Sequence, residues 1–190
     1  MIAHKELIKE INYIQKILDL LKCAKIKKFD ELCKVSINAL KKGKKIILFG
    51  NGGSAADSQH LATELTVRFK RNRKAFAALS LTTDTSAITA IGNDFNFNFI
   101  FSRQLEAIGK SGDIAIAITT SGNSQNIIEA IKIAKKKKIL IYSFCGNDGG
   151  KVKNYTKNII LVPSKETSTI QTIQILIGQV FCKVLEDNLS

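Results

Sequence analysis

Residues 45–54 read KIILFGNGGS, a short unbroken apolar run that leads into a glycine-rich turn. A run of this kind is typical of a strand that is buried on both faces of a parallel sheet. Four more runs of the same texture follow, separated by segments with the apolar spacing of helices, at residues 76–81, 113–118, 139–144 and 158–162. The alternation predicts a doubly wound α/β fold around a five-stranded parallel sheet, as in flavodoxin, with ligands bound beyond the carboxyl ends of the strands.

Both ends of the chain have apolar residues at helical spacing. Residues 1–43 predict two amphipathic helices before the first strand, and residues 169–185 predict a closing helix after the only proline, Pro163. We find no linker, so residues 1–190 are expected to form one domain. Because the first two helices carry more apolar surface than a five-stranded sheet needs, we expect residues 1–43 to pack against another subunit.

Composition narrows the class of protein. The first residues contain no basic-then-apolar leader, and we find no apolar stretch long enough to span a bilayer, so we expect a cytoplasmic protein without a membrane partner. Four scattered cysteines form no C-x-x-C pair and predict buried thiols in a reducing compartment. The formal net charge is +13, but the basic runs lie where predicted elements meet and contain no aromatic residues. We interpret them as solvated helix ends, which disfavours a nucleic-acid partner.

Two strand-to-helix loops carry residues suited to binding an anion. In residues 50–54, three glycines allow a tight turn that leaves backbone N–H groups and the Ser54 hydroxyl at the positive end of a helix dipole. In residues 119–124, hydroxyl side chains stand at the equivalent place after another strand. Two such loops at one edge of a sheet predict a phosphate pocket built from Ser54, Ser121 and Ser124.

Two other interpretations of these loops stay open. Glycine-rich turns between a strand and a helix are common without any ligand, and serines such as Ser54 and Ser124 can serve only as helix caps. A dinucleotide is disfavoured, because the sequence lacks G-x-G-x-x-G followed by a distant acidic residue.

Four longer stretches are similar to the phosphoheptose isomerases, a family of the sugar isomerase (SIS) domain superfamily. They are GNGGSAADSQHLATEL from residue 50, LTTDTSAITAIGND from residue 81, FSRQLEAIG from residue 101 and TTSGNSQNIIEA from residue 119. The resemblance runs through nearly the whole chain. It implies a homotetrameric zinc enzyme that converts sedoheptulose 7-phosphate to D-glycero-D-manno-heptose 7-phosphate, through an enediol, for bacterial surface polysaccharide synthesis.

The resemblance also implies roles for individual residues. Sugar contacts are expected from Asn51, Gly52, Gly53, Asn93 and Asp94, phosphate contacts from Thr119, Thr120, Ser121 and Ser124, and zinc ligands at His60, Glu64, Gln171 and Gln179, of which Glu64 and Gln171 would also meet the substrate. The spacing of His60 and Glu64 supports their pairing independently, because residues four apart share a helix face. Glu64 is the carboxylate we expect to move the proton between C1 and C2.

One position departs from the family pattern. The family has a histidine, its second acid–base group and fourth zinc ligand, where this chain has Gln179, and Thr169 and Thr172 stand where arginine and glutamate are usual. Glutamine cannot exchange a proton near neutral pH. Three functions therefore stay open: an active isomerase of sedoheptulose 7-phosphate, a non-catalytic relative that binds the bacterial replication initiator, and a protein for another phosphosugar.

Overall fold

The structure, a computed structural model, describes residues 2–24 and 26–189. The chain begins with two helices, α1 (Ile2–Cys23) and α2 (Lys27–Lys41), as the apolar spacing predicts. Strands and helices then alternate in the order β1 (Ile46–Gly50), α3 (Gly53–Thr66), β2 (Ala78–Ser80), α4 (Thr85–Asp94), η1 (Phe97–Phe99), α5 (Ile100–Ile108), β3 (Ile114–Ile118), α6 (Gln125–Lys136), β4 (Leu140–Gly146), η2 (Gly150–Asn154), β5 (Ile159–Val162) and α7 (Thr167–Leu189). The five predicted strands are confirmed, and the closing helix is longer than predicted at both ends.

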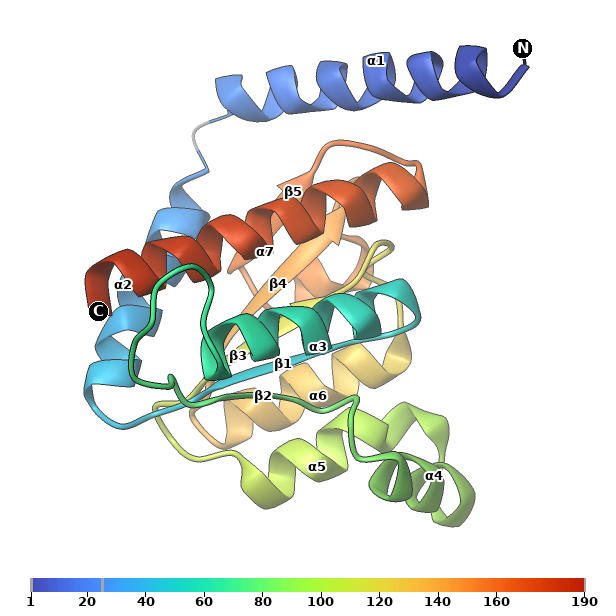
Figure 1. Cartoon of the computed structure of the whole chain (residues 1–190). Coiled ribbons are helices and arrows are strands. Elements are labelled where there is room, and N and C mark those ends of the chain that lie inside the picture. Colours follow the sequence, from blue (N-terminus) through green and yellow to red (C-terminus); the bar gives the residue numbers. More distant parts are fainter. Residues whose placement is uncertain (1, 25, 190) are drawn as a thin grey trace.

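The strands form one parallel sheet in the order β2-β1-β3-β4-β5, which confirms the doubly wound α/β fold (Figure 1). Helices α2, α3 and α7 cover one face, and α5 and α6 cover the other. Neighbouring strands β1 and β3 are in register, with Gly50 opposite Ile118. From β1 the chain passes to one face and from β3 to the other. The two glycine- and hydroxyl-rich loops therefore start side by side at the point where the winding reverses, the usual place for a ligand.

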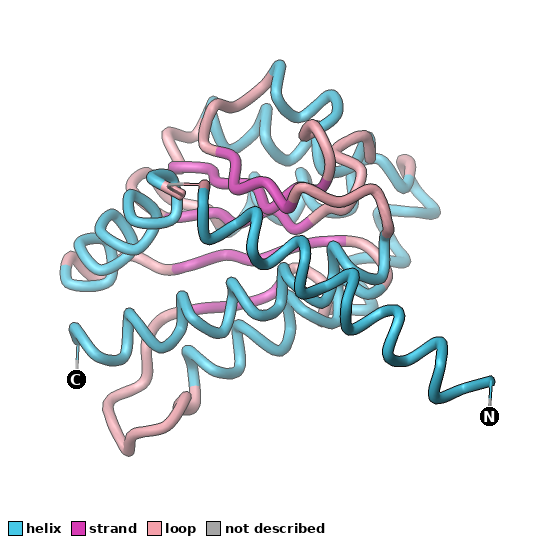
Figure 2. The backbone as a smooth tube through the Cα atoms, turned by 90° about the horizontal axis from the view of Figure 1, so that it is seen from above, coloured by secondary structure: helices cyan, strands magenta, loops and turns pink. Residues whose placement is uncertain are grey.

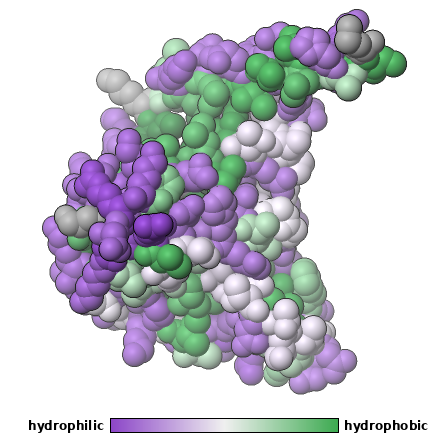
Figure 3. Space-filling view, in the orientation of Figure 1, coloured by the Kyte–Doolittle hydropathy of each residue, from purple (hydrophilic) through white to green (hydrophobic). Residues whose placement is uncertain are grey.

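Helix α1 extends beyond the body of the protein (Figures 1 and 2). Its second half is anchored by Ile17 and Leu21, which are buried, and its first half is tied to α7 where Glu10 accepts a hydrogen bond of 2.9 Å from the hydroxyl of Thr169. Hydrophobic surface is visible along α1 and in the space beneath it (Figure 3). The predicted role of residues 1–43 in subunit packing stays a prediction.

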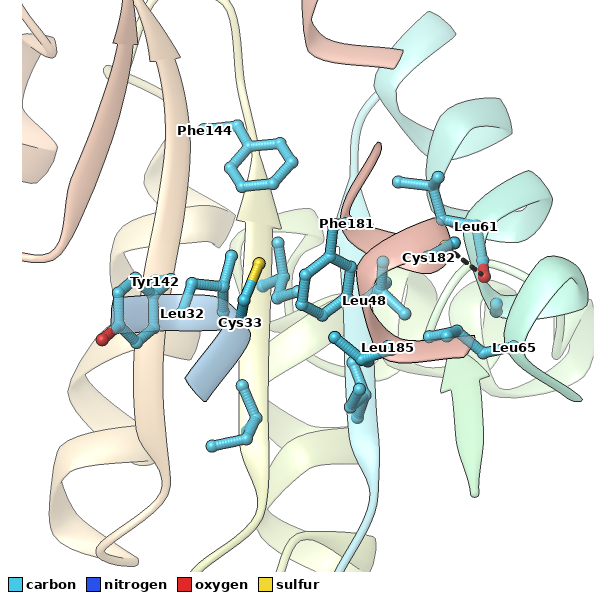
Figure 4. Close-up of a cluster of buried hydrophobic side chains, with 14 of the residues drawn as sticks. Leu32, Cys33, Leu48, Leu61, Leu65, Tyr142, Phe144, Phe181, Cys182 and Leu185 are labelled. Carbon is cyan, nitrogen blue, oxygen red and sulfur yellow. Dashed lines mark hydrogen bonds between the residues drawn. The ribbon is translucent and has the colours of Figure 1, made fainter. Parts of the chain in front are cut away.

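The core on this face of the sheet contains buried side chains from α2, α3 and α7 (Figure 4). Phe181 of α7 is fully buried with Leu48 of β1 and Leu32 of α2. The thiol of Cys182 lies 3.8 Å from the carbonyl oxygen of Leu61 in α3. Because α2 contributes to this core, the exposed large apolar residues of the N-terminal helix pair lie on α1.

Two expectations from composition need correction. Cys23 is exposed, because it ends the helix that leaves the body, whereas the other three cysteines are buried as predicted. Burial raises the pKa of the Cys33 and Cys145 thiols to about 12, so they are unreactive at neutral pH.

The second correction concerns α7. Among the described residues it is the one helix long and apolar enough to meet the criteria for a membrane span, which the sequence interpretation did not anticipate. Its most apolar window is 44% buried inside the protein. Core helices of soluble proteins meet the same criteria, and α7 packs on α3 and on the sheet.

Candidate active site

The first loop leaves β1 and opens α3. Gly52 has a φ of +57°, which favours glycine, and is the N-cap of the helix. Within the described part of the chain, the N–H groups of Gly52 and Gly53 donate no hydrogen bond, so they are available to an anion. Ser54 is buried in the first turn, and a Cβ added at Gly50 would lie 2.8 Å from its Cβ. Because Gly52 holds the N-cap position and no side chain caps the helix, the interpretation of Ser54 as the cap is wrong.

The second loop, between β3 and α6, is held by its own hydroxyl groups and by η2. The Thr119 hydroxyl oxygen accepts from the N–H of Gly122, and the Ser121 oxygen from the N–H of Asn123, each at 3.2 Å. The N–H of Val152 donates to the carbonyl of Gly122 at 2.9 Å. Because both hydroxyls act as acceptors within the loop, their hydrogens remain free to donate to a ligand.

Ser124 begins α6 without capping it. It stands at the N-cap position, but its side chain accepts no hydrogen bond from the helix. Capping therefore does not explain this serine either, and its hydroxyl is available.

A cavity of about 280 Å³ lies beside the second loop. Thr120 and Ser121 line it together with Lys165 and Thr167, which lie after β5 and at the start of α7. Lys165 forms no ion pair with any described residue, so its charge can attract an anion. Asp148 also lines the cavity, and its negative charge is paired with Lys153. Ser54 and Ser124 are not among the lining residues, and the pocket shared by all these hydroxyls stays a prediction.

A reciprocal pair of amides ties the two loops together. Asn51 Nδ2 donates to Asn126 Oδ1 at 3.0 Å, and Asn126 Nδ2 donates to Asn51 Oδ1 at 2.8 Å. The amide expected to meet the sugar is thus already engaged in fixing the distance between the loops. Sequence analysis missed Asn126, because its burial and its pairing with Asn51 are set by tertiary packing.

Helix α3 carries the ionisable groups of the site. His60 Nε2 lies 3.0 Å from Glu64 Oε1, with 47% and 21% of these side chains exposed, so the predicted pairing is confirmed. One turn earlier, Asp57 has a buried oxygen, Oδ2, without a partner among the described residues. Burial raises the pKa of the Asp57 carboxyl, and nearby His60 partly opposes this. Sequence analysis missed Asp57.

A buried ion pair supports the end of α3. Glu186 of α7 accepts hydrogen bonds from the backbone N–H groups of residues 69–71 and, at 3.0 Å, from Arg73 Nε. Arg73 Nη2 in turn donates to the backbone carbonyl of Glu64 at 2.8 Å. Burial alone would raise the pKa of Glu186, but these hydrogen bonds outweigh it and the pKa is lowered. The basic run at residues 70–74 is therefore not simply a solvated helix end, because Arg73 is buried.

Helix α7 faces this group with amides. The side chain of Gln171 lies against the first loop, where a Cβ added at Gly53 would be 2.6 Å from its Nε2. Further along, Gly178 packs on Leu61 with no room for a Cβ. Gln179, the next residue, is half-buried, and its predicted position beside the imidazole–carboxylate pair on α3 stays a prediction.

These donors do not fit a tight four-ligand zinc centre. Among the residues that the structure describes, no third histidine, cysteine, aspartate or glutamate joins His60 and Glu64 in a cluster able to hold a metal ion. Gln171 and Gln179 could add only amide oxygens, whereas zinc prefers imidazole, thiolate and carboxylate. Zinc binding at the four expected residues stays a prediction.

Asn93 and Asp94 form no described hydrogen bond with either loop. Both are exposed at the end of α4, where Asn93 Nδ2 donates to Asp94 Oδ1 at 2.8 Å. Neither lines the cavity beside the second loop. Their expected contact with the sugar stays a prediction.

Comparison with known proteins places this fold in the sugar isomerase class of protein. Residues 11–146 match the family model described as SIS domain. A phosphoheptose isomerase from Paramagnetospirillum magneticum is 50% identical over 83% of this chain and 82% of its own length. One from Clostridium acetobutylicum is 44% identical over 98% of this chain and 89% of its own length. The solved phosphoheptose isomerase of Neisseria gonorrhoeae superposes with a TM-score of 0.90 at 34% identity, covering 97% of this chain and 99% of that one.

Identity at this level over most of both chains establishes the narrower relationship. The chain belongs to the phosphoheptose isomerase family.

Proposed function

We propose that this chain interconverts sedoheptulose 7-phosphate and D-glycero-D-manno-heptose 7-phosphate. The observation that carries the proposal is that α3 opens from a glycine-rich loop tied to the hydroxyl-rich second loop, and presents Glu64, 3.0 Å from His60. Hydroxyl donors suited to a phosphate and a carboxylate able to move a proton are the two parts that this isomerisation needs. The proposed role is a step in bacterial surface polysaccharide synthesis.

The reaction moves one proton between adjacent carbons. Glu64 removes a proton from C1 of the ketose as the C1–C2 double bond of the enediol forms, and the same carboxyl group returns the proton to C2. The proton on O1 must leave and O2 must gain one. Gln179 can hold a hydroxyl group through a hydrogen bond but cannot exchange its proton, so a water or Glu64 itself carries this second transfer.

The test is direct incubation of the purified protein with sedoheptulose 7-phosphate. Aldose formation is followed by NMR, and exchange of the C1 proton with solvent deuterium reports the enediol. We expect turnover that Glu64→Gln abolishes. If the wild type forms no more aldose than this variant, the proposed reaction is wrong.

A non-catalytic role is not favoured. Gln179 is compatible with a protein that only binds a phosphosugar or the bacterial replication initiator. Glu64 speaks against it, because an interaction protein does not need this carboxylate, and the similar curated proteins are named as isomerases.

We propose weak zinc binding. His60 and Glu64 would supply the two strong ligands, and Gln171 and Gln179 would supply neutral oxygens. Equilibrium dialysis with Zn²⁺ tests this, and we expect binding weaker than that of a Gln179→His variant. Equal affinity would show that residue 179 is not a ligand.

We also propose assembly into a homotetramer, in which α1 and α7 meet other subunits. Leu7 of α1 is 58% exposed, and Leu176 and Val180 of α7 are 44% and 40% exposed. A hollow of about 450 Å³ between α1, α2 and α7 is lined almost wholly by apolar residues. Light scattering should find a tetramer that Leu7→Asp weakens. A monomeric wild type at micromolar concentration would contradict the proposal.

We place the protein in the cytoplasm. Three of its cysteines are free and buried, as expected for a reducing compartment, and its proposed substrate is a sugar phosphate. Cell fractionation with an antibody to the chain tests this.

A further inference from the structure

Gln174 of α7 is the most deeply buried of the three glutamines that face α3 and the sheet. Its side chain is 1% exposed, and its Nε2 donates to the backbone carbonyl of Thr119 at 3.1 Å. Thr119 is the first residue of the second loop, directly after β3. A side chain from the last helix therefore holds the start of the hydroxyl-rich loop.

This hydrogen bond fixes the direction of one peptide group. In a trans peptide the carbonyl of Thr119 and the N–H of Thr120 lie in one plane and point in opposite directions. Holding the carbonyl toward Gln174 turns the N–H of Thr120 away from it. Within the described chain this N–H donates no hydrogen bond, and Thr120 lines the cavity that also contains Lys165. The anchored peptide thus offers a free donor to an anion.

The other end of the same amide has no partner. Gln174 Oε1 is buried and accepts no hydrogen bond from any described residue. A buried acceptor left in this state costs about 1–3 kcal/mol. Methionine would remove this unpaired oxygen but would also leave the Thr119 carbonyl without its donor, so the two effects on stability are similar in size and opposite in sign. What only the amide supplies is the donor to Thr119.

We propose that Gln174 is a positioning residue. It sets the orientation of the second loop and thereby the affinity for the phosphate group of the substrate. The inference rests on the proposed function, since it concerns the same site. If Gln174 were only structural, its replacement would lower stability and activity together. We instead expect that loss of the amide weakens anion binding without weakening the fold.

The test compares Gln174→Met with the wild type and with Cys182→Ala, a buried change two turns along the same helix that leaves the loop untouched. We measure KM and kcat for sedoheptulose 7-phosphate, the inhibition constant or direct affinity of inorganic phosphate, and the melting temperature. One hydrogen bond is worth about 1 kcal/mol, so KM and the phosphate constant should rise about 5- to 10-fold. We expect kcat to change less than about 3-fold and the melting temperature to change little.

A second pair of variants keeps the inference testable. Gln174→His restores a donor and should recover most of the phosphate affinity. If methionine does not fold, Gln174→Leu also removes the donor and should bind phosphate at least as weakly. Unchanged phosphate affinity in Gln174→Met, or a parallel fall of stability and activity as in Cys182→Ala, would overturn the inference. Inorganic phosphate reports on the loop even if the wild type does not turn over sedoheptulose 7-phosphate, so the two proposals can fail separately.

Discussion

Helices α3 and α7 pack against each other but bring opposite kinds of side chain to the site. Helix α3 presents Asp57, His60 and Glu64, which carry charge or exchange protons. Along residues 171–179, α7 presents three glutamines, which can only donate and accept hydrogen bonds. This difference in side-chain chemistry separates two functions. The amides of α7 can orient a ligand, which needs only hydrogen bonds, whereas only the ionisable side chains of α3 can transfer a proton.

Removing the proposed base is the strongest way to sharpen this comparison. Glu64→Gln keeps the size and the hydrogen-bonding capacity of the side chain but removes its proton chemistry. We expect kcat for sedoheptulose 7-phosphate to fall by about 10²–10⁴-fold with little change in KM. Glu129→Gln, at a carboxylate of α6 that pairs with Lys132, is the matched control and should keep its rate. A Glu64→Gln variant with wild-type kcat would remove the catalytic role from α3.

The one buried carboxylate of α7 should matter for stability instead. Glu186→Gln leaves Arg73 buried without its ion pair, and both side chains are 2% exposed. We expect a loss of about 3 kcal/mol in the free energy of unfolding, measured by urea denaturation. Asp187→Asn breaks the exposed pair with Arg71 and should cost less than about 1 kcal/mol.

The pH dependence of Glu186 gives a second check. Its pKa is lowered in the folded state, so its contribution is present above the unfolded pKa and is lost as the pH falls through the folded pKa. Wild type should therefore lose more stability in acid than Glu186→Gln does. Equal acid sensitivity of the two proteins would contradict the assignment.

Converting an amide of α7 into an ionisable group should partly erase the contrast between the helices. If Gln179 lies beside the pair on α3, as predicted, Gln179→His adds an imidazole to it, and we expect zinc affinity and turnover both to rise about 10-fold or more. Asn188→His, at an exposed site on the same helix, controls for an added histidine. A wild type that is already fully active, and unchanged or slowed by the substitution, would show that another group supplies the proton.

The fold could be predicted because its signals are local. Each buried strand is an unbroken apolar run, and glycine or hydroxyl residues mark the two loops that follow β1 and β3. The position of α1 could not be predicted, because apolar spacing shows that a helix has a buried face but not what buries it. For the same reason Cys23, at the end of α1, was wrongly expected to be buried.

The site was predictable where one motif supplies both partners. His60 and Glu64 lie four residues apart, so helix geometry alone brings them together. Asn126, Arg73 and Gln174 were missed, because their partners lie on other elements far away in the sequence. Such long-range polar contacts depend on tertiary packing, which no local pattern encodes.

The smallest expected effect concerns Asp57 on α3. Burial raises its pKa, so its contribution to stability is fully present below the unfolded pKa and is lost as the pH rises through the folded pKa. At neutral pH the ionised carboxylate is a cost, and Asp57→Asn should raise the free energy of unfolding by less than about 1 kcal/mol there and leave it unchanged in acid. Thermal unfolding at several pH values measures this. Asp19→Asn is the control of opposite sign, since hydrogen bonds from Lys22 and Gln15 lower the pKa of that exposed carboxyl. If Asp57→Asn instead loses stability at neutral pH, the carboxylate has a partner in the assembled protein, and α3 then holds its charge for a contact between subunits.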